Sequence, residues 1–259
     1  MTELLVLHIA KQEIQAVTLD GSRVRTLVGD VDETPDGIVV DQARGHIYWT
    51  NMGTPDPGSG HGSRSTFFTR NGSIERVNLD GSDRRTVVPP GAFTTGKQLT
   101  ADFDAGLLYW CDREGMQVLC CRLDGSDLQT LVVAGRGEAD ARDARNHCVG
   151  VALDPERRLV YWTQKGAPDS GQGRIFRCGS DIPAGQSPAD RTDIELLGRT
   201  CPNPSTWIWI PPDTWCGPTA ARSRTATRSI AARSSRRSGH TGSCPGATRK
   251  RSVWRQPTT

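Results

Sequence analysis

The sequence lacks several features that would assign it to a common functional class. Its first residues, Met-Thr-Glu-Leu-Leu, contain neither a basic leader nor a long apolar run, so we expect no secretory signal and no membrane span. It has no nucleophile elbow, phosphate-binding loop or zinc signature. No stretch shows sustained helical periodicity. We therefore expect a cytoplasmic, all-β protein without a cofactor, a metal or a membrane partner.

The cysteines also lack the spacing that disulfide frameworks and metal sites require. The chain has eight of them, and none forms a Cys-x-x-Cys pair. Three lie beyond residue 200, and the other five are scattered along strand-like segments: Cys111, Cys120, Cys121, Cys148 and Cys178. This distribution predicts reduced thiols in the core.

What the sequence does contain is an internal repeat with two motifs. One motif is an aromatic tetrad with an Asp seven residues before its Tyr, at Asp41, Asp102 and Asp154. Its three copies are Tyr48-Trp49-Thr50-Asn51, Tyr109-Trp110-Cys111-Asp112 and Tyr161-Trp162-Thr163-Gln164.

The other motif, Leu-Asp-Gly-Ser, begins at Leu19, Leu79 and Leu123. Its Asp-Gly suits a tight hairpin because glycine adopts positive φ without steric cost. Each unit therefore reads as four short strands. In the last copy these are residues 149–153, 159–163, 174–178 and 193–197. The two later Leu-Asp-Gly-Ser copies lie 44 residues apart, as expected for a four-stranded propeller blade.

These motifs resemble the YWTD repeats of low-density-lipoprotein-receptor-type β-propellers, over about residues 4–199. The resemblance implies an incomplete six-bladed propeller with about four blades, one of three strands and three of four. Asn51 and Gln164 stand where the family has Asp, which puts in doubt the inter-blade contacts that this Asp makes. The repeated residues themselves most simply pack one blade against the next.

The repeat ends at Thr200, and the composition changes there. Residues 201–259 carry ten Lys and Arg against one acidic residue, Asp213. Basic tails can bind nucleic acid or membranes. The codons that the residues after Thr200 require instead support a frameshift caused by the loss of one base near codon 200. Because Trp has a single codon, Trp207-Ile208 and Trp209-Ile210 each specify Asp in the earlier frame.

The restored text reads PEPVDLDLDPAGHLVWTDRG and resembles residues 150–163. We therefore predict a partial propeller at 1–200 and a frameshifted, disordered tail at 201–259. Taking the first strand, Leu4 to Ile9, as an inner strand, we expect an open arc that exposes strand edges and a poorly soluble chain.

Two long loops indicate a binding face. Residues 52–72 and 165–173 share Gly-x-Pro-Asp-x-Gly, contain Asp56 and Asp169, and follow second strands. Alternation of strands places them at the same end as Asp36, Lys97 and His147, which precede or begin inner strands. With Asn51, these residues are the candidate ligand-binding set, although turn formation alone also explains the Asp and Gly positions.

Two classes of function fit this arrangement. One is a non-catalytic scaffold that binds a protein or small ligand on this upper rim, impaired by the truncation. The alternative is an enzyme that uses the central channel, in the manner of lactonase-like or strictosidine-synthase-like propellers. No residue is assigned a catalytic role, and no specific nucleic-acid partner is expected. Whether the protein is an enzyme stays open at this stage.

Overall fold

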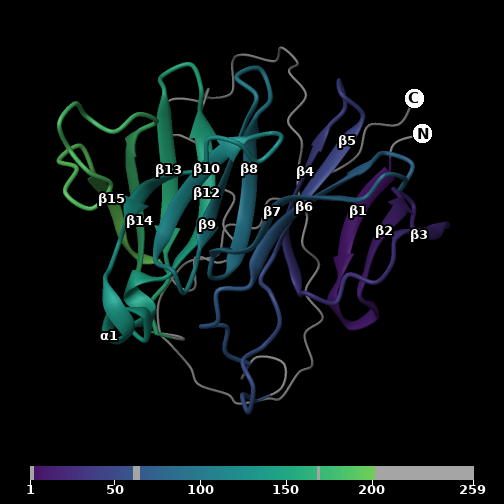
Figure 1. Ribbon diagram of the computed structural model, residues 1–259, viewed down its shortest axis with the longest axis horizontal. Helices are drawn as coiled ribbons and strands as arrows, with labels where there is room; N and C mark the ends of the chain where they lie inside the picture. The colour runs from purple at the N-terminus through teal and green to yellow at the C-terminus, as the bar shows by residue number, and fades with distance from the viewer. Residues whose placement is uncertain (1–2, 61–64, 168–169, 202–259) are drawn as a thin grey trace, which may run out of the picture.

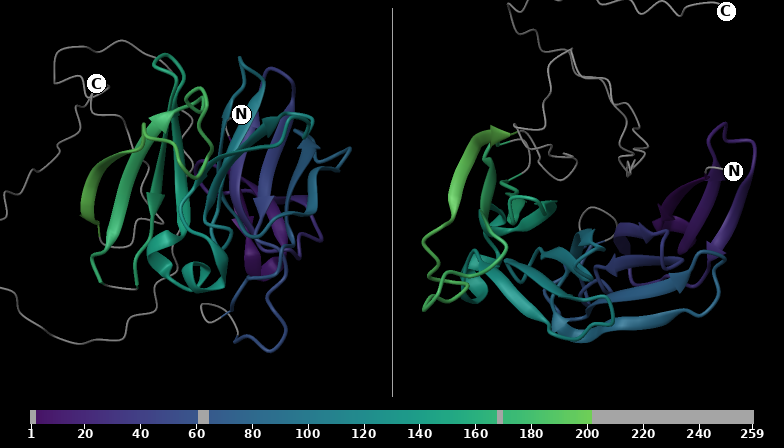
Figure 2. Two further views of the ribbon diagram at one scale, coloured as in Figure 1. Left: turned by 60° about the vertical axis from the view of Figure 1, so that its left-hand side comes forward. Right: turned by 90° about the horizontal axis from the view of Figure 1, so that it is seen from above.

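The computed structural model describes residues 3–60, 65–167 and 170–201 of the 259-residue chain. Nearly all regular structure in these ranges is β, arranged as four antiparallel sheets (Figure 1). Seen from above, the four sheets stand side by side along an arc that runs from β1 to β15 (Figure 2). One sheet has three strands and three have four, so the predicted partial propeller is confirmed.

Each blade is built from strands that follow one another in the chain. Blade 1 contains β1 (Glu3–His8), β2 (Glu13–Thr18) and β3 (Val24–Val28). Blade 2 contains β4 (Pro35–Asp41), β5 (His46–Asn51), β6 (Gly72–Asn78) and β7 (Arg85–Phe93). Blade 3 contains β8 (Gly96–Asp102), β9 (Leu107–Asp112), β10 (Gln117–Arg122) and β11 (Gln129–Val133).

Blade 4 contains β12 (Cys148–Asp154), β13 (Leu159–Gln164), β14 (Gly173–Gly179) and β15 (Glu195–Cys201). The helix α1 (Gly137–Ala141) and the 3-10 helices Ile9–Lys11 and Ala144–Asn146 are short. The sequence predicted that the last strand begins at Asp193, but in the structure it begins at Glu195. The Asp193 carboxylate accepts a hydrogen bond from the Gly179 amide at 2.9 Å and pairs with Arg191, so it closes the preceding loop instead.

The aromatic tetrads occupy the second strand of each four-stranded blade, as predicted. Trp49, Trp110 and Trp162 are at most 2% exposed and form the largest buried side chains of the core. The core lies between blades as well as within them, because Tyr48 of blade 2 packs in one cluster with Leu108 of blade 3. The five cysteines predicted to be core thiols are free and buried.

The Leu-Asp-Gly-Ser turns join strands within a blade, and those of blades 2 and 3 contact the neighbouring blade. The Asp124 carboxylate accepts a hydrogen bond from the Ser126 amide at 2.9 Å, which closes the turn between β10 and β11. Gly125 has φ +86°, and a Cβ there would stand 2.0 Å from the Val87 carbonyl oxygen of blade 2. The turn therefore requires glycine both for its conformation and for close approach to the previous blade.

The third tetrad residue supplies an inter-blade hydrogen bond. The Thr50 hydroxyl donates to the Lys97 carbonyl at 2.6 Å and accepts from the Gly37 amide at 2.9 Å. Cys111 takes the same position in blade 3, where its thiol contacts the Gly150 carbonyl at 3.3 Å. These contacts do not involve the fourth tetrad residue, which varies and whose Asp112 copy instead accepts hydrogen bonds from the segment that joins blades 2 and 3.

The strands of blade 1 occupy other positions in the blade than we expected from the sequence. The turn at residues 19–22 joins β2 to β3, whereas the corresponding turns join the third and fourth strands of blades 2 and 3. Strand β1 thus takes the position of a second strand, and the expectation that the chain begins with an inner strand is wrong. The inner strands are β4, β8 and β12.

Candidate binding site at the mouth of the inner strands

The sequence-predicted residues Asp36, Lys97 and His147 lie where the inner strands begin. The Lys97 ammonium contacts the Asp36 carboxylate and also approaches the Met52 sulfur at 3.8 Å. The Lys165 amide donates to the His147 carbonyl at 3.0 Å. Both long loops therefore begin beside these residues, and the β5–β6 loop and α1 lie at the same, lower end in Figure 1. We call this end the channel mouth.

The Asp36–Lys97 ion pair connects blades 2 and 3 at the channel mouth. The side chains are 26% and 14% exposed, respectively. Partial burial lowers the effective dielectric around the pair, so its Coulomb attraction is stronger than that of a fully solvated pair. The pair leaves no charge in excess, because each group neutralises the other.

Three further charged residues at the channel mouth were not predicted from the sequence: Arg113, Glu114 and Lys165, the last of which interacts electrostatically with Lys97. The Arg113 Nε lies 2.6 and 2.7 Å from the two Glu114 carboxylate oxygens, and Glu114 is only 5% exposed. Arg113 and Lys165 each directly follow a tetrad, as Met52 does in blade 2. That shared position was the available signal, since the residue after each tetrad emerges at the channel mouth.

Lys165 carries the excess positive charge of the channel mouth. Burial lowers its pKa, the charge of Arg113 lowers it further, and Glu114 opposes the change. Lys165 forms no ion pair within the described part of the chain. The part of the channel mouth around Lys165 thus holds three cations and two carboxylates, an arrangement that favours an anionic ligand group.

His147 is buried and holds a neighbouring segment in place. Its Nε2 lies 2.7 Å from the Ala141 carbonyl at the end of α1, so this nitrogen donates. Its Nδ1 is buried without a hydrogen-bond partner among the described residues. Burial, the largest effect, lowers the pKa of His147, and the ring is therefore neutral at pH 7.

Asn51 is fully buried, and its amide is already hydrogen-bonded. Its oxygen accepts from the Trp49 indole at 3.1 Å, and its nitrogen donates to the Ser73 hydroxyl at 2.9 Å. Asp56 instead organises its own loop, accepting from the Phe68 and Thr69 amides at 2.8 and 2.9 Å. A ligand role for either residue stays a prediction.

Asp169 lies outside the described residues. Within the described ranges, no group of three His, Cys, Asp or Glu side chains is placed to hold a metal ion. The same ranges contain no helix of the length and hydropathy that a membrane crossing needs.

Comparison with known proteins identifies the repeat. No family model matches the chain. Over 189 residues the chain is 46% identical to "Low-density lipoprotein receptor-related protein 1" of Pyricularia oryzae, which covers 71% of this chain and 56% of that protein. This chain is an LDL-receptor-like YWTD β-propeller. The tetrads, their strand positions and the blade order agree with this assignment.

Two further similarities place the propeller among known proteins. It is 36% identical over 192 residues to "3-hydroxyacyl-CoA dehydrogenase-like protein LAM1" of Cochliobolus heterostrophus, covering 73% of this chain and 38% of that one. The propeller thus spans about half or less of these two relatives. The solved nidogen/laminin complex contains a chain with TM-score 0.53 and 16% identity, over 76% of this chain and 61% of that one, which supports the fold alone.

Proposed function

We propose that the propeller is a non-catalytic scaffold that binds an acidic group of a protein or small ligand at the channel mouth. The observation that carries the proposal is the position of Lys165. This half-buried cation stands near Arg113 and Lys97, whose carboxylate partners, Glu114 and Asp36, are already engaged in ion pairs. A carboxylate or phosphate brought to this place would relieve the repulsion among the three cations.

The size of this effect is sufficient for recognition. Two unit charges 4 Å apart attract by about 4 kcal/mol at the effective dielectric near a protein surface, before desolvation of the ligand is subtracted. An anionic ligand should also raise the pKa of Lys165, because the charged ammonium then gains a partner. The Asp36–Lys97 pair would fix the orientation of the site, since it spans two blades.

A selection experiment tests the proposal. We would select a random peptide display library on the 259-residue chain and measure the enriched peptides by calorimetry. We expect them to carry Asp, Glu or a free C-terminal carboxylate, and to bind at least about tenfold more weakly to Lys165→Met, a loss of about 1.4 kcal/mol. The matched control is Lys11→Met, an exposed lysine in the 3-10 helix after β1. Equal binding to wild type and Lys165→Met would refute the proposal.

A further inference from the structure

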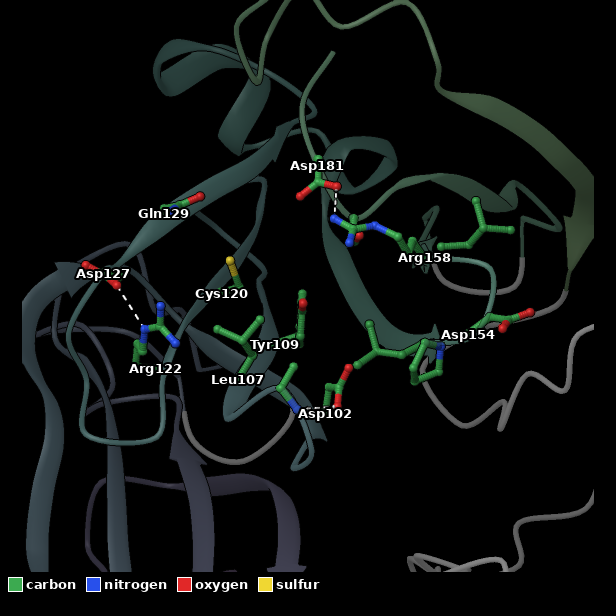
Figure 3. Close-up of a pocket in the computed structure, with 15 residues that line it drawn as sticks. Asp102, Leu107, Tyr109, Cys120, Arg122, Asp127, Gln129, Asp154, Arg158 and Asp181 are labelled. Carbon is green, nitrogen blue, oxygen red and sulfur yellow. Dashed lines mark hydrogen bonds and ion pairs between the residues drawn. The ribbon is translucent and has the colours of Figure 1, made fainter. Parts of the chain in front are cut away.

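A cavity of about 310 Å³ lies between blades 3 and 4, at the opposite end of the strands from the channel mouth. The turns β8–β9 and β12–β13 form two of its sides, and strand β10 forms another. Figure 3 shows Tyr109 and Cys120 close together in the cavity, with the Arg122–Asp127 and Arg158–Asp181 pairs on opposite sides. None of these residues belongs to the proposed anion site.

Comparison of equivalent positions in the blades explains why the cavity exists. At the interface of blades 2 and 3, the ring of Phe103 packs against Tyr48, with 6.5 Å between ring centroids. The position of Phe103 follows the Asp that precedes each tetrad, and in blade 4 it is taken by Pro155. The smaller Pro155 leaves the space beside Tyr109 open.

A second difference lies across the strand pair. Arg76 is the cross-strand partner of Tyr48, and Arg177 is the partner of Tyr161, whose hydroxyl accepts a hydrogen bond from it. In blade 3 the corresponding partner of Tyr109 is Cys120. The Tyr109 hydroxyl therefore lacks the cross-strand guanidinium of its counterparts and makes no hydrogen bond within the described part of the chain, although Arg158, which is paired with Asp181, lies close enough to interact with it electrostatically.

A third difference concerns the Asp of the turn. Arg44 donates to the Asp41 carboxylate at 2.9 Å and also reaches the Phe103 carbonyl of blade 3 at 3.1 Å. In blade 3 the residue at the position of Arg44 is Ala105. Asp102 accepts only the Ala105 amide, at 2.9 Å, and forms no ion pair among the described residues.

These three differences together give the cavity a specific chemistry. Leu107 and Leu153 form the apolar part of the lining, and of its four carboxylates three are paired with arginines, which leaves Asp102 without an ion pair among the described residues. Burial raises the pKa of Tyr109 to about 12, and nearby Cys120 and Asp102 add to the rise. The phenol is therefore neutral and keeps a lone pair for an incoming donor.

We propose that this inter-blade cavity binds the arginine side chain of a partner protein. The guanidinium would donate to the Asp102 carboxylate and the Tyr109 hydroxyl, replacing the two arginines that blade 3 lacks. Its aliphatic stem would lie against Leu107 and Leu153, where burial of methylene groups is favourable. Charge-assisted hydrogen bonds of this kind are about twice as strong as neutral ones, so the site discriminates in favour of a cation.

The charges at the opening indicate a peptide-borne arginine rather than the free amino acid. Asp127 and Asp181 stand at the sides of the cavity, where each is already paired with an arginine, so Asp102 is the carboxylate that a ligand would meet without a partner. The carboxylate of free arginine would be repelled by the unpaired Asp102 carboxylate, whereas a peptide backbone brings no charge. A protein segment is therefore the occupant that the charges favour.

The chain has three tyrosines, one in each tetrad, which makes a direct test possible. We would label tyrosine rings with ¹³C and titrate the full chain with N-acetyl-arginine amide. We expect the Tyr109 signal to shift with a saturable, millimolar Kd, as is reasonable for one side chain, while the Tyr48 and Tyr161 signals stay in place. N-acetyl-citrulline amide, the neutral isostere, and free arginine should each bind at least about fivefold more weakly.

Two variants complete the test. Ala105→Arg supplies the missing partner of Asp102 and should abolish the shift, whereas Ala43→Arg, the same change at an exposed position of the blade 2 turn, should leave it intact. Asp102→Asn should weaken binding at least about fivefold without filling the cavity. The proposal is overturned if the citrulline probe binds as well as the arginine probe, if all three tyrosines shift together, or if the Tyr109 signal does not respond. Tighter binding of free arginine would overturn the peptide assignment.

Discussion

Cys120 lies directly opposite Tyr109 on the neighbouring strand, at a place where the other four-stranded blades have arginine. Its thiol does not replace the guanidinium, because burial raises the pKa of Cys120 to about 11 and keeps it neutral. This strand position is one of three at which the open inter-blade interface differs from a filled one. The difference can be reversed by mutation.

We predict that Cys120→Arg stabilises the protein. The new guanidinium fills the cavity and can donate to the Tyr109 hydroxyl and the Asp102 carboxylate, which adds about 1.5–3 kcal/mol for a net hydrogen bond to a charged group. The free energy of unfolding in urea would measure this gain. Cys121→Arg is the matched control. Its side chain is 0% exposed in the core, so the buried charge should cost several kcal/mol. A loss of similar size in both variants would contradict the prediction.

A second prediction concerns the inter-blade hydrogen bond of Thr50. Thr50→Val keeps the shape of the side chain but leaves the Lys97 carbonyl and the Gly37 amide without this partner, which should cost about 1–3 kcal/mol. Thr50→Cys should cost less, because Cys111 makes the equivalent contact in blade 3. Urea midpoints at constant m-value would compare the two variants. If Thr50→Cys proved the more harmful, the hydrogen bond would not be the cause.

The buried Asp112 should make stability depend on pH. Burial, the largest effect, raises its pKa to about 6, although the Thr94, Thr95 and Gly115 amides oppose the rise. A carboxyl with a higher pKa when folded binds more protons in the folded state. Its stabilising contribution is therefore complete below the unfolded pKa and is lost as pH rises through about 6.

Comparison with Asp112→Asn isolates this contribution, since the other groups cancel. From pH 4 to pH 7, the free energy of unfolding of wild type should fall relative to the variant by up to about 3 kcal/mol. Asp124→Asn is the control with the opposite sign: hydrogen bonds from Ser126 lower the pKa of Asp124, so its contribution is lost as pH falls. A difference between wild type and Asp112→Asn that does not change with pH would disprove the assignment.

The repeat made the fold predictable, and its exceptions made the sites hard to predict. Tetrads and Asp-Gly turns have fixed positions in a blade, so the strands around Tyr109 and Tyr161 followed from the sequence. The channel mouth was predicted in part, since Asp36, Lys97 and His147 came from strand order. Lys165 was missed because a charged residue after a strand is ordinary by itself. Its significance depends on the distance to Arg113, which only the packing of two blades determines.

The inter-blade cavity could not be predicted from any single motif. It arises where Cys120, Ala105 and Pro155 are all smaller than their counterparts in another blade, and these residues lie on three different segments. Each replacement alone is unremarkable in an alignment of the repeats. The prediction that β1 is an inner strand failed for a related reason: the first strand contains no tetrad, and only the turn at residues 19–22 fixes its register.

The last prediction concerns residues 202–259, which lie outside the described part of the chain. If one base was lost near codon 200, the genomic sequence in the earlier frame must encode Asp at both Trp-Ile pairs, Trp207-Ile208 and Trp209-Ile210. Sequencing independent isolates across codon 200 distinguishes two explanations. If the isolates contain the additional base, the present sequence carries a sequencing error. If all of them lack it, the frameshift is natural. Each alternative then has its own consequence for the protein.

Restoring the base should convert the tail into further blade strands and give a soluble product with one cooperative unfolding transition, because strand edges left open by the arc gain partners. The 259-residue chain should be less soluble, and deletion of residues 202–259 should change its stability little, since a tail with few apolar residues cannot offset its ordering entropy. Sedimentation and urea unfolding of the three forms would decide the matter. If deletion of residues 202–259 lowered the stability of the chain, and if these residues were protected from protease in the 259-residue form, the present frame would encode folded structure.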